Sequence, residues 1–279
     1  MKKIIILFTL ILTSTLSISQ NKAIRSKVIG NGQPILFLPG FTTPGSIWKE
    51  TVEHLQINSE AHLISYAGFN RIEPIKMPWY ATIKSELLNY IQQKDLQEFI
   101  IIGHSMGGTL ATDIASEIPS KVAKIILVDA LPCMREVMMP GVPASNLAYE
   151  SPFNKRMIDM TEDQFKMMAT SMAGGMTDNS TKKEIVANWI LEADRKTYVY
   201  GYTDLLKLDT RSGLKKIQSK ALILVAPAYG NASKTTMENQ YANLEHKTVK
   251  LAPKGKHFIM FDNEEWFYKE VNAFIISEK

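Results

Sequence analysis

A serine between two glycines, at the junction of a strand pattern and a helix pattern, is the feature that most constrains this chain. The run 98–102 predicts a buried strand, and the segment 105–118 carries apolar residues at helical spacing. Gly103 and Gly107 flank Ser105 at this junction. So sharp a turn strains the backbone of the serine, and the glycines leave room where any side chain would collide. We therefore expect the hydroxyl to project above a sheet.

This strand-turn-helix arrangement, a nucleophile elbow, favours acyl transfer. Backbone N–H groups at the start of the helix, and the positive end of its dipole, would meet an anion that forms beside the hydroxyl of Ser105. The alternative is a glycine-rich turn with an ordinary surface serine, because a five-residue pattern also occurs by chance. The strand and helix patterns on either side favour the elbow.

Short apolar strands alternate with helical patterns along most of the chain. This alternation predicts an α/β fold with a mostly parallel sheet that is flanked by helices. Helical spacing marks 83–91 and 110–118, and a last helix is expected to begin at Asp262 and Glu265, which occupy capping-box positions. Strands are expected at residues 27–30, 35–38, 63–66, 99–102, 125–128, 221–225 and 248–251.

The alternation stops after the fifth expected strand and resumes near Asp209. We interpret residues 132–204 as an inserted helical cap, and residues 20–131 and 205–279 as the core. Two helices of the expected cap should begin at capping boxes, Thr161 with Gln164 and Thr181 with Glu184.

Methionines are concentrated in the expected cap, since nine of the 14 lie between Met134 and Met176. Their flexible thioethers suit an adaptable apolar wall over a substrate pocket, and they suit an ordinary helix core equally well. Gly174 and Gly175, placed between two cap helices, could permit lid movement. Candidate pocket residues are Trp48, Met134, Met168, Met172 and Trp189, with packing beneath the pocket as the alternative for Trp48.

A serine hydroxyl is a poor nucleophile unless a base removes its proton during attack. His257 is the candidate base, because it lies between the last expected strand and the last helix, in a turn that opens at the same carboxyl edge of the sheet as Ser105. His104 neighbours the serine, but adjacent residues on an elbow diverge. We therefore interpret His104 as a packing residue.

The histidine needs an acid that holds its tautomer and stabilises its charged form. Asp129, at the carboxyl end of the strand 125–128, is the nearest carboxylate on the correct edge. We assign it as the acid, over the alternative that it only anchors the start of the cap. Asn231 could orient the histidine through its amide, and Glu238 and Asp262 are weaker options.

Two backbone N–H groups are candidates for an oxyanion hole. The turn after the strand 35–38 contains Pro39, Gly40 and Phe41, and the N–H of Phe41 would act together with that of Met106. Because Pro39 has no N–H, the backbone geometry and the freedom of Gly40 matter more here than any side chain.

The first 19 residues have the features of a secretory signal peptide. Lys2 and Lys3 precede an apolar stretch from Ile4 to Leu12, and small residues stand before Gln20. The apolar stretch is short for a membrane span, which requires roughly 20 residues. A retained anchor is the less favoured alternative, so we expect an exported protein, periplasmic or extracellular, with no stable membrane span.

Without residues 1–19 the chain has 260 residues, which fits one large α/β domain with an insertion. It then carries 30 Lys and Arg against 28 Asp and Glu, so its net charge of about +2 gives no footprint for nucleic acid. The single cysteine, Cys133, excludes an internal disulfide, and the five histidines show no zinc spacing. We expect neither metal nor cofactor.

Three motifs carry a resemblance to a known superfamily: Gly-His-Ser-Met-Gly-Gly at 103–108, Leu-Pro-Gly-Phe at 38–41 and the segment 256–262. With them the chain resembles the α/β hydrolases from about residue 33 onward, and within them the esterase, haloperoxidase and carbon–carbon hydrolase branch. That branch has a helical cap after strand six of the family's numbering. The resemblance implies Ser105 as nucleophile, His257 as base, and the N–H groups of Phe41 and Met106 as oxyanion hole.

The chain departs from the superfamily's pattern in two places. The acid that usually follows strand seven is missing, although some lipases of this fold place it after strand six, where Asp129 stands. Pro39 replaces the histidine of the common His-Gly pair. Epoxide hydrolases and haloalkane dehalogenases use an aspartate nucleophile, so Ser105 argues against both.

The sequence therefore predicts an exported, carboxylesterase-like serine hydrolase that cleaves a small to medium carboxylic ester or lactone through an acyl-enzyme. A carbon–carbon bond hydrolase or a cofactor-free perhydrolase on the same scaffold is the nearest alternative. A catalytically weak ligand-binding protein is a further one, because no acid follows the strand 221–225. The expected partner is a small-molecule ester.

Overall fold

The computed structural model describes residues 22–227 and 231–277, and the expected signal peptide therefore lies outside the described residues. Seven described strands form one sheet, in which only the pair of β1 and β3 is antiparallel. The expected α/β fold with a mostly parallel sheet is confirmed. In their order across the sheet the strands are β1 (Ile24–Ile29), β3 (Ser59–Tyr66), β2 (Gln33–Leu38), β4 (Phe99–His104), β5 (Val122–Val128), β6 (Lys220–Val225) and β7 (Lys247–Leu251).

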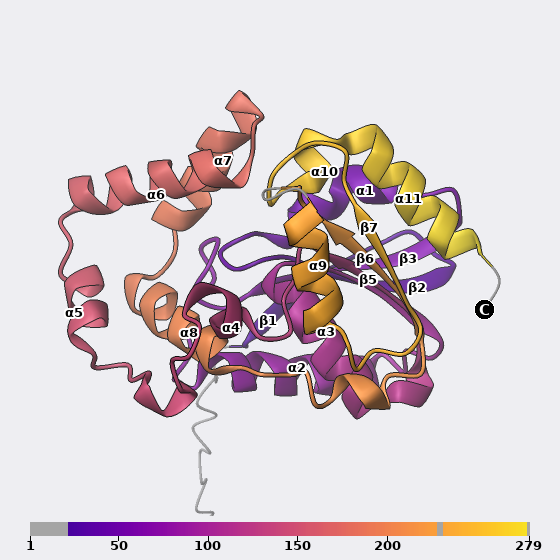
Figure 1. Ribbon diagram of the computed structural model, residues 1–279. Helices are drawn as coiled ribbons and strands as arrows, with labels where there is room; N and C mark the ends of the chain where they lie inside the picture. Colours follow the sequence, from indigo (N-terminus) through magenta and orange to yellow (C-terminus); the bar gives the residue numbers. More distant parts are fainter. Residues whose placement is uncertain (1–21, 228–230, 278–279) are drawn as a thin grey trace, which may run out of the picture.

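Helices cover both faces of the sheet (Figure 1). On one face, the side chain of Asn272 in α11 bonds the backbone of His54 and Gln56 beside α1. On the other face, Lys84 of α2 pairs with Asp113 of α3 at 3.4 Å. These core helices are α1 (Lys49–Glu53), α2 (Trp79–Gln93), α3 (Met106–Glu117), α9 (Asn231–Gln240), α10 (Ile259–Asp262) and α11 (Glu264–Ile276).

The central strands are apolar without alternation because both of their faces are covered. Every residue of β4 is buried, and so is every residue of β5 except Ala123; even Lys124 is only 5% exposed. The Lys124 ammonium donates to the carbonyls of Phe274, Ile275 and Ser277, which end α11. The buried charge is thus satisfied at a helix C-terminus, where a cation is favoured.

The register of the parallel strands brings their carboxyl ends to one edge of the sheet. Gly103 of β4 lies opposite Leu38 of β2 and Leu127 of β5. The ladder continues past the strand ends, since the N–H of Ser105 donates to the last residue of β5 at 2.9 Å and that of Asp129 to β6 at 2.8 Å. Ser105 and Asp129 therefore follow neighbouring strands at the same edge.

Helical segments fill the chain between β5 and β6, and no strand is described there. In Figure 1 helices α5 to α8 extend to one side of the sheet. The boundary expected at residue 204 falls inside α8, which continues to Lys207, and the assignment of residues 132–204 as a cap stays a prediction. We call these residues the cap segment; its helices are α4 (Met134–Met138), α5 (Pro152–Ile158), α6 (Glu162–Met176), α7 (Ser180–Leu191) and α8 (Arg195–Lys207).

One of the two predicted capping boxes in the cap segment is present. Thr161 and Gln164 exchange hydrogen bonds between side chain and backbone at the start of α6. The box predicted at Thr181 and Glu184 is wrong, because α7 begins earlier and the side chain of Asn179 caps it. An asparagine caps a helix as well as a threonine does, so both starts fitted the sequence.

Two further local predictions are wrong. Asp262 does not cap α11, because it ends the short α10 and its carboxylate accepts from other segments. Gly174 and Gly175 do not separate two helices but lie in the last turn of α6. No helix within the described ranges is both long and apolar enough to cross a membrane.

Candidate active site

Ser105 occupies a strained turn between β4 and α3. Its φ of 53° lies in the left-handed region, which a residue with a side chain adopts only at an energetic cost. The crowding around it explains the flanking glycines: a Cβ at Gly103 would lie 2.3 Å from the carbonyl oxygen of Gly107, and one at Gly107 would lie 2.1 Å from that of Leu38. The backbone can therefore turn this sharply only with glycine at both positions.

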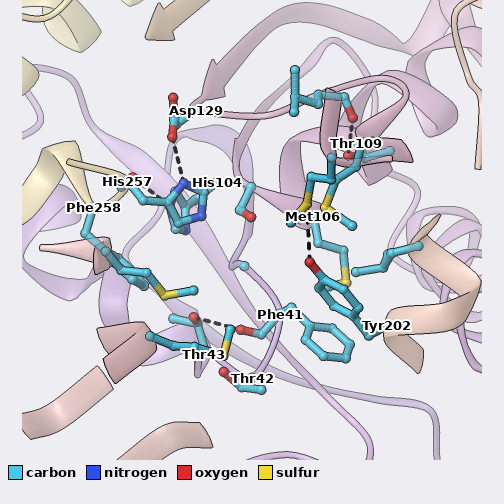
Figure 2. A pocket seen from close by; sticks show the side chains of 18 of the residues that line it. Phe41, Thr42, Thr43, His104, Met106, Thr109, Asp129, Tyr202, His257 and Phe258 are labelled. Atoms are coloured by element: carbon cyan, nitrogen blue, oxygen red, sulfur yellow. Dashed lines mark hydrogen bonds and ion pairs between the residues drawn. The ribbon is translucent and has the colours of Figure 1, made fainter. Parts of the chain in front are cut away.

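The side chains of His257 and Asp129 meet at this edge, with 2.7 Å between Nδ1 and Oδ2 (Figure 2). The other carboxylate oxygen of Asp129 accepts from the N–H of Ala226 at 3.0 Å. Because a carboxylate only accepts, the Nδ1 of His257 carries a proton and its Nε2 is left as the acceptor. This is the tautomer that a general base beside a serine requires.

The other acids considered for the third position are engaged elsewhere. The carboxylate of Asp262 accepts from the backbone of Lys256 and of Asp178. Glu238 lies 3.8 Å from the ammonium of Lys234, one turn away in α9. The side chain of Asn231 lies outside the described residues. Asp129 is thus the candidate whose carboxylate contacts His257, and its role as the acid stays a prediction.

His104 is buried beneath the site. Its ring lies 4.5 Å from that of His257 and 4.6 Å from that of Phe258, measured between ring centroids. Burial, aided by the neighbouring His257, lowers the pKa of His104 well below its ordinary value, so the ring is neutral. These contacts agree with the interpretation of His104 as a packing residue.

The loop after β2 approaches the serine closely. A Cβ at Gly40 would lie 2.9 Å from Nδ1 of His104 and 3.3 Å from Cβ of Ser105. Phe41 and Met106 both line the cavity at the serine, and neither backbone N–H donates to a protein acceptor within the described ranges. Both groups are therefore available to an oxyanion, which is the role predicted for them.

A cavity of about 320 Å³ contains Ser105, His257 and Asp129. Its walls come from both the core and the cap segment and are mostly apolar. Methionine is its most frequent lining residue, and the thioethers of Met138 and Met172 accept hydrogen bonds from Tyr202 and Tyr198 at 3.4 and 3.3 Å. The methionines and aliphatic residues of the wall are Met106, Met134, Met138, Met172, Met176, Met237, Leu131, Val186, Ile190, Leu205 and Leu208.

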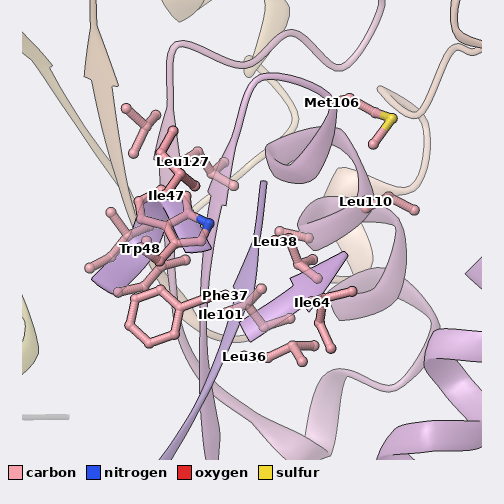
Figure 3. Close-up of a cluster of buried hydrophobic side chains, with 14 of the residues drawn as sticks. Leu36, Phe37, Leu38, Ile47, Trp48, Ile64, Ile101, Met106, Leu110 and Leu127 are labelled. Atoms are coloured by element: carbon pink, nitrogen blue, oxygen red, sulfur yellow. The ribbon is translucent and has the colours of Figure 1, made fainter. Parts of the chain in front are cut away.

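Two of the five predicted pocket residues, Met134 and Met172, line this cavity. Trp48 does not, since it is fully buried in the core and packs on Phe37 with ring centroids 5.6 Å apart (Figure 3). Met168 is also absent from the wall and packs against the core. Trp189 lies behind the wall, with its ring 6.3 Å from that of Phe258.

Tyr198 and Tyr202 are pocket residues that the sequence reasoning missed. They lie one helical turn apart in α8, so both face the cavity, and the ring of Phe41 lies 5.7 and 5.9 Å from theirs. Burial raises the pKa of both tyrosines, so their hydroxyls stay protonated donors. The spacing of four residues was the signal that could have found them.

The polar groups of the cavity are side chains and backbone N–H groups. In the described part of the chain, no three His, Cys, Asp or Glu side chains are grouped so that they could hold a metal ion. Besides the candidate residues, the polar groups that line the cavity include the hydroxyls of Thr43 and Thr109. The hydroxyl of Thr109 donates to the carbonyl of Leu131 at 3.0 Å. The cavity is thus suited to an uncharged group held next to a serine and a histidine.

Comparison with known proteins finds relatives that are named as esterases. The chain is 24% identical over 257 residues to the pimeloyl-[acyl-carrier protein] methyl ester esterase of Shewanella woodyi, covering 88% of this chain and 95% of that enzyme. Its match to the Vibrio campbellii enzyme of that name, at 28% identity over 103 residues, spans only 39% of that enzyme and 37% of this chain.

The fold is similar to that of an esterase from Exiguobacterium antarcticum. The two structures superpose with a TM-score of 0.77 at 20% sequence identity, over 92% of this chain and 98% of the other. A sequence model of the alpha/beta hydrolase family matches residues 35–270, which include the whole candidate site. The chain therefore belongs to the alpha/beta hydrolase family.

Proposed function

We propose that this protein is an exported serine esterase that cleaves small to medium carboxylic esters through an acyl-enzyme. The observation that carries the proposal is the 2.7 Å contact between His257 and Asp129 in the cavity that also contains Ser105. The esterase names of the relatives from Shewanella woodyi and Vibrio campbellii support ester hydrolysis.

The proposed reaction begins with attack of the Ser105 hydroxyl on the ester carbonyl. His257 takes the serine proton at Nε2 and returns it to the departing alcohol, while Asp129 stabilises the charged imidazole. The N–H groups of Phe41 and Met106 bind the oxyanion, and each such donor contributes about a hundred- to a thousandfold to the rate. Water, activated by His257 in the same way, then releases the acid from Ser105.

The lining of the cavity supports an ester with an apolar acyl group. Thioethers together with aliphatic and aromatic side chains form most of its wall, and the charged residues that line it are limited to Asp129 among the described ones, apart from a protonated His257. A charged acyl group would lose its hydration there without gaining an ionic partner. We therefore propose that the preferred substrates are neutral.

Export rests on the first 19 residues, with Lys2 and Lys3 before a short apolar stretch and small residues before Gln20. Expression of the full chain in a Gram-negative host tests it. We expect the mature protein in the periplasm or the medium, with an N-terminus near residue 20 in its mass spectrum. An intact N-terminus in the cytoplasmic fraction would contradict export without touching the esterase proposal.

Hydrolysis of p-nitrophenyl acetate, butyrate and octanoate by the purified protein tests the reaction, with Ser105→Ala as the matched variant. We expect turnover that is abolished in Ser105→Ala, and covalent labelling of Ser105 by a fluorophosphonate. If neither protein turns over any ester and Ser105 does not react, the catalytically weak ligand-binding alternative replaces the proposal.

A further inference from the structure

The carboxylate of Asp262 joins the loop that carries His257 to the cap segment. One oxygen, Oδ2, accepts from the backbone N–H of Lys256 at 2.8 Å. The other, Oδ1, accepts from the hydroxyl of Thr177 at 2.6 Å and from the N–H groups of Asp178 and Asn179 at 2.9 and 3.2 Å. A single side chain thus binds the residue before the candidate base and the junction between α6 and α7.

Other contacts run between the same two segments. The N–H of Phe258 donates to the carbonyl of Met176 at 3.0 Å, and the ammonium of Lys256 donates to the carbonyl of Gly174 at 2.9 Å. His257 is therefore flanked on both sides by residues whose backbone or side chain is bonded to the end of α6. Within the junction Thr177 is 0% exposed, whereas Asp178 is exposed and Asn179 half-buried.

The turn before His257 is built to bring Asp262 close. Gly255 has a φ of +105°, which disfavours any residue with a side chain, and a Cβ there would lie 2.8 Å from the Cβ of Asp262. The tight approach places the Lys256 N–H within reach of the carboxylate. Asp262 was considered above as a weaker candidate for the triad acid, but both of its oxygens are occupied by these donors.

We propose that Asp262 is a positioning residue. Through its hydrogen bonds the position of the cap segment determines the position of the His257 imidazole. This deepens the proposed function and rests on it where catalysis is concerned, while the coupling itself is a property of the fold. The α6 and α7 side chains Met172, Met176 and Val186 line the cavity, so an acyl group that seats against them acts on the same junction that Asp262 binds. Reactive geometry at the base is sensitive to shifts of this kind, since about 1 Å of misplacement can cost a hundredfold in rate.

Two variants separate the two ends of this link. In Asp262→Asn one oxygen becomes an NH₂ donor, which must face either the N–H of Lys256 or the donors of the junction, so one end opens. Thr177→Val keeps the shape of the buried threonine and removes a hydroxyl that donates to Asp262 and accepts from the N–H of Asn179 at 3.2 Å, so it changes the cap side only. Asp159→Asn is the matched control, since Asp159 is 57% exposed in its side chain and pairs with Lys155 on the surface of α5.

Hydrogen–deuterium exchange of the folded full chain tests this coupling independently of activity, because it measures how well the backbone of each segment is protected. We expect Asp262→Asn to raise exchange in peptides covering 254–258 and 176–180, and Thr177→Val to raise it in 254–258 although no residue of that loop is changed. Asp159→Asn should match the wild type in both peptides. Unchanged exchange of 254–258 in Thr177→Val overturns the proposal, and this variant decides the question if Asp262→Asn does not fold.

Ester hydrolysis supplies the second readout. With p-nitrophenyl butyrate we expect Asp262→Asn to lose about tenfold or more in kcat/KM, chiefly through kcat, at temperatures where circular dichroism shows the fold intact. A purely structural role would lower the Tm and leave kcat unchanged, which would overturn the positioning role. If the wild type hydrolyses no ester, the proposed function fails, while the exchange experiment still decides the coupling.

Discussion

The Nε2–H of His104 donates a hydrogen bond to the backbone carbonyl of His257, with 3.0 Å between nitrogen and oxygen. The residue before the candidate nucleophile thus holds the backbone of the candidate base. A carbonyl only accepts, so the proton of the neutral ring lies on Nε2 and Nδ1 is unprotonated. This Nδ1 has no hydrogen-bond partner in the described part of the chain. We therefore expect His104 to position the backbone of His257 in addition to packing beneath it.

Replacement of His104 by phenylalanine is expected to weaken both stability and activity. Phenylalanine keeps an aromatic ring in the buried site but loses the donor, which leaves the carbonyl of His257 unpaired. We expect the free energy of unfolding to fall by about 1–2 kcal/mol, measured by urea denaturation, and kcat/KM to fall with it. His246→Phe, at an exposed position, is the control and should change stability by less than about 0.5 kcal/mol. Equal behaviour of the two variants would contradict the assignment.

The neutral state of His104 also predicts a pH dependence of stability. Its pKa is lowered in the folded protein, so between that pKa and the unfolded value of about 6.5 the unfolded chain binds the extra proton. The free energy of unfolding should therefore fall as the pH drops below about 6.5, by up to about 1.4 kcal/mol per pH unit from this one group. His104→Phe should lose this part of the slope, while the part from His62, whose pKa is also lowered by burial, remains. Parallel slopes in the two proteins from pH 7 to 5 would show that His104 does not contribute.

Asp129→Asn is expected to remove nearly all turnover while leaving the fold intact. The amide can still accept from Ala226, but it no longer holds the imidazole of His257 in the required tautomer or stabilises its charge. The loss of kcat should be about ten-thousandfold, by analogy with the same change in other serine hydrolases. Steady-state kinetics with p-nitrophenyl butyrate measures it, and Glu238→Gln is the control for a neutralised acid outside the site. Retention of a tenth or more of kcat would exclude Asp129 as the acid.

The proximity of Asp129 and His257 could be anticipated because it depends on local patterns and on one property of parallel sheets. The apolar runs marked the strands, and residues that follow neighbouring parallel strands meet at one edge. Ser105 could be predicted from the two glycines that flank it and from the strand and helix patterns on either side. These signals are short in range and specific in residue type.

The cavity walls could not be predicted in the same way. Whether Met172 or Met168 faces the cavity depends on how α6 is rotated against the core, which its own sequence leaves open, and Trp189 packs behind the wall for the same reason. The contact of Asp262 with Thr177 joins residues 85 positions apart. Such pairings follow from tertiary packing between helices, for which periodicity gives the apolar face but not the partner.

Gly175→Ala is expected to stabilise the protein without loss of activity. Gly175 lies in the last turn of α6, and a Cβ there meets nothing within 4 Å. Alanine should therefore raise the free energy of unfolding by about 0.5–1 kcal/mol through its higher helix propensity. Gly107→Ala is the contrasting variant, because its Cβ would collide with the carbonyl of Leu38. A fall in kcat for Gly175→Ala would instead indicate that this turn must bend during the reaction.

Because the wall of the cavity is apolar, we expect the enzyme to discriminate between esters by the length of their acyl chain. Met172 lines the cavity from α6, and its thioether is held by the hydroxyl of Tyr198 at 3.3 Å. Met172→Phe puts a rigid ring in place of a flexible chain and narrows the space for a long acyl group. We expect kcat/KM for p-nitrophenyl octanoate to fall by about tenfold or more relative to that for the acetate, since single methylene-sized changes in an apolar pocket are worth about 1–3 kcal/mol.

The matched control is Met167→Phe, the same substitution five positions earlier in α6, where the residue is 66% exposed. It should leave the ratio of octanoate to acetate unchanged. If Met172→Phe also leaves that ratio unchanged while the wild type hydrolyses both esters, the acyl group does not lie against α6. The acyl group would then lie against Met134 and Met138, on the part of the wall contributed by α4, and the equivalent change at Met134 should alter the ratio instead.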